Sequence, residues 1–211
     1  MLLYAVAAAD ADGTGDAVET PLEALRCRGL TVFAEPRTQP PERSMRELIR
    51  FGQVLHQLWS YVSVLPMRFG TVVSDRDELD ELVAEHESEW TDRLAAVTGR
   101  SECIVHLPLP ERVSEHVRDE QTGSDYLRRR ATEVKRHDAE TAELRALLAP
   151  YASEITPLQP VRPQESRLSV LVPDEQVEAA RTAIQDWAVS RSGATVTGPW
   201  PPFSFCQEVG E

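Results

Sequence analysis

The distribution of hydrophobic and polar positions over the first 35 residues predicts three strands. The run 2–10 (LLYAVAAAD) is short and apolar and ends in a turn rich in Asp and Gly, which predicts a buried strand. The segments 20–27 and 30–35 flank Arg28 and Gly29, and LTVFAE (30–35) has the β-branched and aromatic content of a strand. We therefore expect a hairpin that closes on Gly29.

The pattern changes to helical spacing after Pro41. Apolar residues recur every three or four positions over 48–62, with Ser44 as a candidate N-cap, so an amphipathic helix is expected. A second helix is expected to begin after Ser74 and run to Thr98, because acidic residues lie at its start and Gly99 follows its end. The alternating run ECIVHLPL (102–109) predicts the next strand.

The stretch between these helices, SVLPMRFGTVV (63–73), has strand chemistry with two interruptions. Pro66 removes a ladder donor and Gly70 weakens the pleat, which predicts an edge strand or a bulge. Arg68 places a charge in this apolar run. Either it points outward or pairs with a carboxylate of 74–81, or it is the polar anchor of a docking surface.

The second half repeats the mixture of helices and strands. After a polar stretch, 110–123, we expect a helix over 124–148, strands at 155–161 and 167–173, a helix from 174 to 193, and a closing strand with its tail in 194–205. Together the elements predict an α+β protein, with helices on one face of a largely antiparallel sheet in its first half. By length we divide it into domains at 1–108 and 109–211, the second ending in the tail 198–211.

Composition and charge disfavour several kinds of partner. The 211 residues carry a formal net charge of −13 and the pI is near 4.9, which disfavours nucleic acid and anionic membrane surfaces. Cys27, Cys103 and Cys206 lack paired spacing and indicate reduced thiols in a cytosol. The first residues show neither a secretion signal nor an anchor, so we expect the protein to stay inside the cell.

Candidate chemistry is sparse. The chain lacks the glycine-rich phosphate loop and the common hydrolase motifs. Asp10, Asp12 and Gly15 match three places of a calcium loop, but Pro21 occupies the place of its bidentate Glu, which favours a solvated turn. The five histidines are scattered, and the basic run 126–138 is better explained as a solvated helix face than as an anion site. We expect no catalytic residue, cofactor or metal.

The stretch GPWPPFSF (198–205) near the end of the chain has two interpretations. A proline-rich segment can be a ligand for the aromatic groove of another protein. It can also be a closing strap that lays Trp200, Phe203 and Phe205 on the protein's own body, which its position directly after a β-branched run favours.

The segments LPMRFGTVV and GPWPPFSF, in that order and separated by YLRRRA, resemble the GvpL/GvpF family of gas vesicle proteins. The first strand, LLYAV, is also similar to that family's start, and the resemblance covers nearly the whole chain. It implies two α+β domains, the first ferredoxin-like and the second a variant of that topology.

The resemblance also implies a function. It indicates a cytoplasmic, non-enzymatic accessory protein without a cofactor, a minor gas vesicle component that binds the hydrophobic shell protein and limits its aggregation during nucleation. Two alternatives stay open: an architectural adaptor for other gas vesicle accessory proteins, and a ferredoxin-like enzyme or small-molecule sensor. Our hypothesis for the partner-binding residues is Pro66, Arg68, Phe69, Gly70, Trp200 and Phe203.

Overall fold

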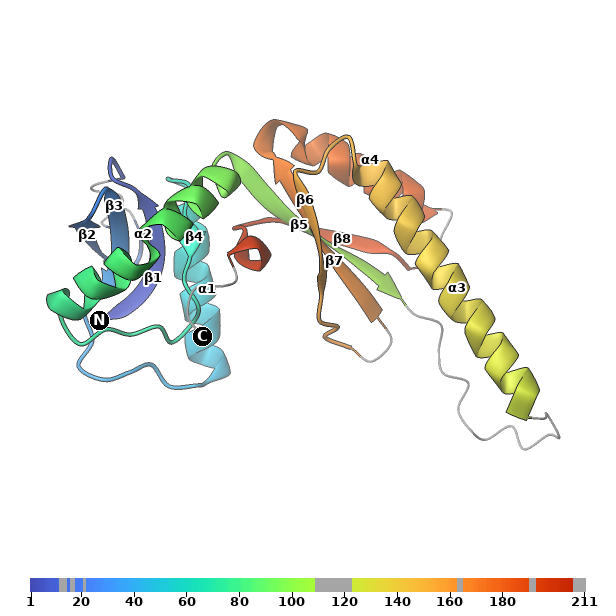
Figure 1. Ribbon diagram of the computed structural model, residues 1–211, viewed down its shortest axis with the longest axis horizontal. Coiled ribbons are helices and arrows are strands. Elements are labelled where there is room, and N and C mark those ends of the chain that lie inside the picture. The colour runs from blue at the N-terminus through green and yellow to red at the C-terminus, as the bar shows by residue number, and fades with distance from the viewer. Residues whose placement is uncertain are drawn as a thin grey trace. The chain divides into compact units, whose positions relative to one another are not determined.

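The protein is described by a computed structural model that divides into two compact units (Figure 1). Unit 1 comprises Met1–Glu102 and the chain from Trp200 onward, and unit 2 comprises Cys103–Pro199. The structure describes residues 1–11, 15, 18–20, 22–108, 123–162, 165–189 and 193–206, with side chains in all of these except 123–127, 129, 130, 133 and 134.

Unit 1 contains a four-stranded sheet and two long helices. The strand order is β2-β3-β1-β4, and β1 pairs antiparallel with both β3 and β4. Its elements in chain order are β1 (Leu2–Ala8), β2 (Glu23–Cys27), β3 (Leu30–Glu35), α1 (Met45–Trp59), β4 (Leu65–Pro66), α2 (Arg76–Val97) and the short 3-10 helix η3 (Phe203–Phe205).

The predicted hairpin and its turn are confirmed. β2 and β3 pair antiparallel, and Cys27 lies opposite Leu30 across a turn of two residues. Arg28 and Gly29 have φ values of 49° and 83°. Two consecutive positive φ angles match the twist of the flanking strands, and glycine adopts such an angle without steric cost.

Both faces of β1 are buried. Tyr4 faces the core cluster that contains Phe51 and Leu55 of α1, while Leu3 and Val6, which are also completely buried, lie outside that cluster. Helix α2 contacts β1 and β4. The sequence had led us to expect helices on one face only. A continuous apolar run such as this strand is typical of burial on both faces.

The interrupted strand is an edge strand, as predicted, but only Leu65 and Pro66 remain of it. Beyond them the chain makes a turn in which the Thr71 N–H donates to the Arg68 carbonyl over 3.1 Å. Gly70 has a φ of 90°, which side-chain-bearing residues rarely adopt. The chain then returns to the edge of β1, where the Leu3 N–H donates to the Thr71 carbonyl over 2.9 Å.

Unit 2 has the complete element order of a ferredoxin-like fold, β-α-β-β-α-β, with strands in the order β6-β7-β5-β8. The sheet of unit 1 has the equivalent strand order, but the described residues between β1 and β2 contain no α-helix. The predicted α+β class is thus confirmed, with the complete order in the second unit. The elements are β5 (Arg100–Pro108), α3 (Gly123–Leu148), β6 (Glu154–Leu158), β7 (Glu165–Pro173), α4 (Val177–Val189) and β8 (Thr195–Trp200).

The observed division differs from the expected one at residue 108. Strand β5 hydrogen-bonds within the second sheet, and its Cys103 and Val105 belong to the core that Leu148 and Ile184 complete. The division falls within β5, after Glu102, so that most of this strand belongs to unit 2. The end of the chain differs too, because the residues from Trp200 belong to unit 1 rather than to the second half.

Candidate partner-binding groove

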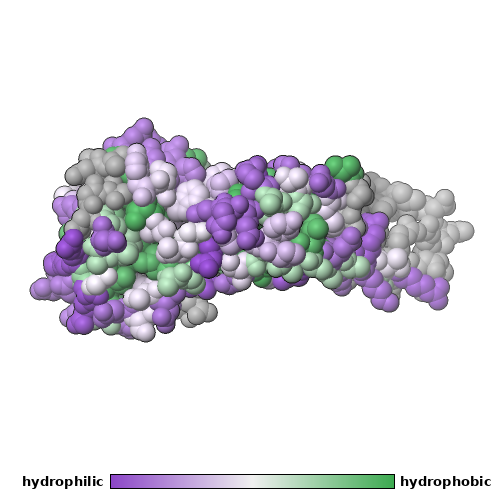
Figure 2. All heavy atoms as spheres, turned by 90° about the horizontal axis from the view of Figure 1, so that it is seen from above, coloured by the Kyte–Doolittle hydropathy of each residue, from purple (hydrophilic) through white to green (hydrophobic). Residues whose placement is uncertain are grey.

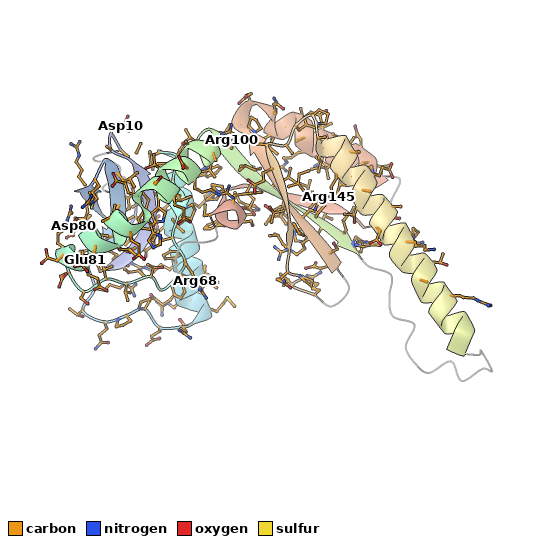
Figure 3. The ribbon with its side chains drawn as sticks, viewed as in Figure 1. Asp10, Arg68, Asp80, Glu81, Arg100 and Arg145 are labelled. Carbon is orange, nitrogen blue, oxygen red and sulfur yellow. The ribbon has the colours of Figure 1, made fainter. Side chains whose placement is uncertain are left out.

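A groove of about 720 Å³ opens on unit 1 between two segments that lie far apart in the sequence. One wall comes from residues 40–48, where α1 begins, and the other from the turn 68–71. In Figure 3, Arg68 lies beside α1. Three of the six predicted partner-binding residues line this groove. Its lining consists of Pro40, Pro41, Arg43, Ser44, Met45, Leu48, Arg68, Phe69, Gly70 and Thr71.

The helical wall exposes apolar side chains that its sequence pattern would place in a core. Ser44 caps α1, with its side chain accepting a hydrogen bond from the Glu47 N–H over 3.3 Å, as predicted. Within the first two turns, Met45, Leu48 and Ile49 are 71%, 46% and 53% exposed. Leu48 belongs to the stripe that predicted the helix, so this stripe extends beyond the surface that the sheet covers.

The opposite wall is anchored by Phe69. Its ring is partly buried against the core cluster and meets Phe51 edge to face, with ring centroids 5.3 Å apart. Arg68, one residue earlier, is exposed and has no side-chain hydrogen bond or ion pair with any described residue. Of the two structural alternatives for Arg68, the outward orientation is therefore observed rather than a pair with an acidic residue of 74–81.

A network of charged side chains fixes the helical wall to the sheet. The Arg50 guanidinium donates two hydrogen bonds to the Glu35 carboxylate, over 2.7 and 3.1 Å, and the Tyr4 hydroxyl donates to it over 3.0 Å. Arg37 bridges Glu35 and Glu47 over 2.9 and 2.8 Å. The segment leading into α1 and its first two turns are thereby tied to the ends of β1 and β3.

The ionisation states suit this network. Burial acts to raise the pKa of Glu35, but hydrogen bonds from Arg50, Arg37 and Tyr4 outweigh it and hold the pKa below its ordinary value. Burial, together with the negative charge of Glu35, raises the pKa of Tyr4 to about 12. At neutral pH the carboxylate is therefore charged and the Tyr4 hydroxyl keeps the proton that it donates.

The groove differs in charge from the molecule as a whole. Arg43 and Arg68 line it, whereas none of its lining residues is acidic, in a chain of net charge −13. Neither guanidinium is paired with another side chain of the described residues. On the face drawn in Figure 2, hydrophilic residues cover much of the surface of both units. The groove combines an apolar lining with two cations available to a partner.

The other three predicted partner-binding residues lie outside the groove. Pro66 is buried, so it offers no surface to a partner. Trp200 and Phe203 are 40% and 37% exposed. The indole of Trp200 lies near the His56 imidazole, with ring centroids 6.1 Å apart.

The tail containing these two aromatic residues is held by Phe205. Its side chain is completely buried, and its carbonyl accepts a hydrogen bond from the Arg93 guanidinium. The preceding Ser204 donates through its N–H and its hydroxyl to Glu102, over 2.8 and 2.5 Å. The strap interpretation thus holds for Phe205, whereas Trp200 and Phe203 remain partly open. Sequence reasoning missed Glu102, a 1% exposed carboxylate whose signal was its place in an apolar strand.

Metal-ligating clusters and one buried thiol can be assessed in the described residues. They contain no group of three or more His, Cys, Asp or Glu side chains that could hold a metal ion. Cys27 donates to Asp80 over 2.9 Å, and burial and this hydrogen bond raise its pKa to about 11, so the thiol stays protonated at neutral pH. Asp12 of the calcium-loop hypothesis and His116 lie outside the described residues.

The basic run 126–138 has the exposure expected of a solvated helix face where its side chains are described. In the basic run, Lys135 and Arg136 are exposed, and Arg136 lies 3.8 Å from Glu140 one helical turn later. Helical spacing also allows Arg129 of this run to pair with Glu133, but both side chains lie outside the described ones. Across the part of the chain that the structure describes, none of the helices has the length and apolar character to span a membrane.

The fold has counterparts among solved structures. The crystal structures of gas vesicle protein GvpF from Microcystis aeruginosa and from Anabaena sp. each superpose with a TM-score of 0.78 at 16% identity, covering 98% of both chains. The fold thus defines the class of protein: a two-unit α+β protein with the GvpF architecture.

Sequence comparison specifies the family. The chain belongs to the gas vesicle synthesis protein GvpL/GvpF family, whose model matches residues 1–207. It is 27% identical to gas vesicle protein L1 of Halobacterium salinarum, over 96% of this chain and 81% of that protein. It is also 27% identical to gas vesicle protein L of a Streptomyces species, over 72% of this chain and 65% of that protein. The expected resemblance is confirmed.

Proposed function

We propose that this member of the GvpL/GvpF family is a minor gas vesicle component that binds the hydrophobic shell protein and limits its aggregation during nucleation. It would act in the cytoplasm and on gas vesicles. Since the family is not a known enzyme family, we propose neither a catalytic activity nor a cofactor. The observation that carries the proposal is the groove of unit 1, where Met45 and Leu48 expose apolar surface beside Phe69.

The physical argument joins this groove to the charge of the molecule. A shell protein that assembles into an apolar wall exposes hydrophobic surface before assembly, and such surface aggregates unless a partner covers it. A groove with exposed apolar side chains can cover part of that surface. The net charge of −13 on the accessory protein would keep the resulting complexes apart in solution.

A co-purification experiment tests the proposal with the full chain. Met45→Glu and Leu48→Asp together place acidic groups in the first two turns of α1, where they suit the helix dipole and leave the core intact. We expect the amount of shell protein retained by this double variant to fall about tenfold or more below that of the unmodified chain. An interface of this kind depends on a few central apolar contacts.

The matched control is Val161→Asp, which changes an apolar side chain that is 74% exposed in unit 2. It should retain as much shell protein as the unmodified chain. Equal retention by the double variant and the control would contradict the assignment of the groove to the shell protein.

The adaptor alternative makes a different prediction. An adaptor would bind other gas vesicle accessory proteins and leave the shell protein unbound. Pairwise binding of the full chain to each vesicle protein distinguishes the two functions. Our proposal requires measurable binding to the shell protein alone, with no third protein present. We also propose Trp200 and Phe203 as a second contact surface, because both side chains are partly exposed on unit 1.

A further inference from the structure

We infer that the groove of unit 1 receives an amphipathic helix of a partner protein whose apolar face is flanked by acidic side chains. Its apolar residues would contact Met45, Leu48 and Phe69, and its carboxylates would bind Arg43 and Arg68. The inference rests on the proposed function in that it specifies the chemistry of the segment bound there.

The edge of the sheet argues against a bound strand. Strand addition needs a row of free backbone groups along an edge. Pro66 has no N–H, the Met67 N–H donates to the Tyr4 carbonyl over 2.8 Å, and the Thr71 N–H donates to the Arg68 carbonyl. The ladder at this edge is two residues long. Recognition in the groove must therefore depend on side chains.

The lining of the groove suits a helix. Pro40, Pro41, Met45, Leu48 and Phe69 give it apolar contacts on both walls, and its volume of about 720 Å³ is large enough for several side chains. A helix presents apolar side chains at positions i, i+3, i+4 and i+7 along one face, which is how amphipathic helices occupy apolar grooves.

The charges of the groove favour a helix with acidic side chains beside its apolar face. Arg43 and Arg68 line the groove without a described ion-pair partner, and guanidinium groups pair well with carboxylates. The start of α1 adds partial positive charge, since Ser44 and Met45 also line the groove. Of the carboxylates near the lining, Glu47 is engaged by Arg37 over 2.8 Å, and Glu42 is exposed to solvent and is not one of the lining residues. A basic helix would meet only cations in this lining.

Two synthetic peptides of about 18 residues, or five helical turns, test this inference. They share one leucine face, and the flanking positions carry Glu in one peptide and Lys in the other. Fluorescence anisotropy with the full-length protein should give about tenfold tighter binding of the Glu peptide at low salt, an advantage that shrinks as ionic strength rises.

Variants locate the effect. Arg43→Gln with Arg68→Gln should weaken binding of the Glu peptide about tenfold and leave the Lys peptide no weaker. The matched control is Arg162→Gln, an exposed arginine of unit 2, which should change neither affinity. Equal affinities for the two peptides, no binding of either, or an unchanged affinity in the double variant would each overturn the inference.

The two proposals can fail separately. If the Glu peptide is preferred and the arginine variants remove that preference, but the unmodified chain retains no shell protein, the groove binds an acidic helix of another partner and the proposed function is wrong. If shell protein is retained while the two peptides bind equally, the proposed function stands and the inference about the acidic helix is wrong.

Discussion

The two ends of helix α1 contain similar apolar residues, but those near one end are buried in the core and those near the other are exposed. Near the C-terminal end, Leu55 and Leu58 are completely buried in the core of unit 1. Near the N-terminal end, Met45 and Leu48 are 71% and 46% exposed at the groove. The comparison shows that a helical apolar stripe can stabilise a fold over part of its length and remain available to a partner over the rest.

The arginines of unit 1 divide in the same way. Arg37 and Arg50 are bound to Glu35 and secure the fold, whereas Arg43 and Arg68 line the groove without a described carboxylate partner. Residue type therefore does not separate structural from available side chains. What separates them is whether the fold supplies a carboxylate partner. The substitutions below test this distinction.

The largest effect is expected in the tail, where a completely buried phenylalanine and a partly exposed one lie two residues apart. Phe205 is completely buried and Phe203 is 37% exposed. Phe205→Ala should lower the free energy of unfolding by about 3–5 kcal/mol, because it removes a buried ring and leaves a cavity. Phe203→Ala should cost about 1 kcal/mol or less. Urea denaturation measures both, and equal losses would contradict the anchoring role of Phe205.

Within α1, Leu55→Ala should cost about 2–5 kcal/mol of unfolding free energy, since its side chain is 0% exposed in the core. Leu48→Ala should change it by less than about 0.5 kcal/mol, because the side chain already meets solvent. The same denaturation assay compares the two. A loss at Leu48 as large as that at Leu55 would show that the groove wall is part of the core.

The charged network gives the next effect. Glu35→Gln leaves Arg37 and Arg50 without their shared carboxylate, so we expect a loss of about 2 kcal/mol in unfolding free energy. Glu42→Gln, at an exposed carboxylate without a described side-chain partner, is the matched control and should be neutral. Thermal unfolding followed by circular dichroism decides between a structural and a dispensable network.

Acid should produce the smallest effect of this series. The pKa of Glu35 in the folded protein lies below its ordinary value. Its contribution is therefore complete above the unfolded pKa of about 4.3 and is lost as pH falls through the lower folded value. The stability difference between the unmodified chain and Glu35→Gln should shrink over this range. If the difference in unfolding free energy between the two chains stays constant from about pH 6 to about pH 3, the ion pairing of Glu35 with Arg37 and Arg50 is contradicted.

Local features of the fold could be predicted because short segments determine them. The hairpin at Gly29, the cap at Ser44 and the interruption at Pro66 all follow from the conformational limits of single residues. The α+β class followed from the order of these elements. The expected division at 108 differed from the observed one, because β5 pairs with strands that come more than forty residues later in the chain.

The groove could be predicted only in part. The sequence singled out Arg68, Phe69 and Gly70, because a charge and a glycine interrupt an apolar run there. The opposite wall, including Met45 and Leu48, was predicted as an ordinary amphipathic helix. Whether such a stripe is covered depends on where the sheet ends beneath it, and this depends on contacts between distant segments.

The central claim is that the exposed end of α1 binds the shell protein. Light scattering of shell protein diluted from denaturant, in the presence of the full chain, tests it most directly. The unmodified chain and Val161→Asp should suppress aggregation, and the chain with Met45→Glu and Leu48→Asp should fail to do so at an unchanged unfolding free energy. Equal suppression by the double variant would contradict the claim.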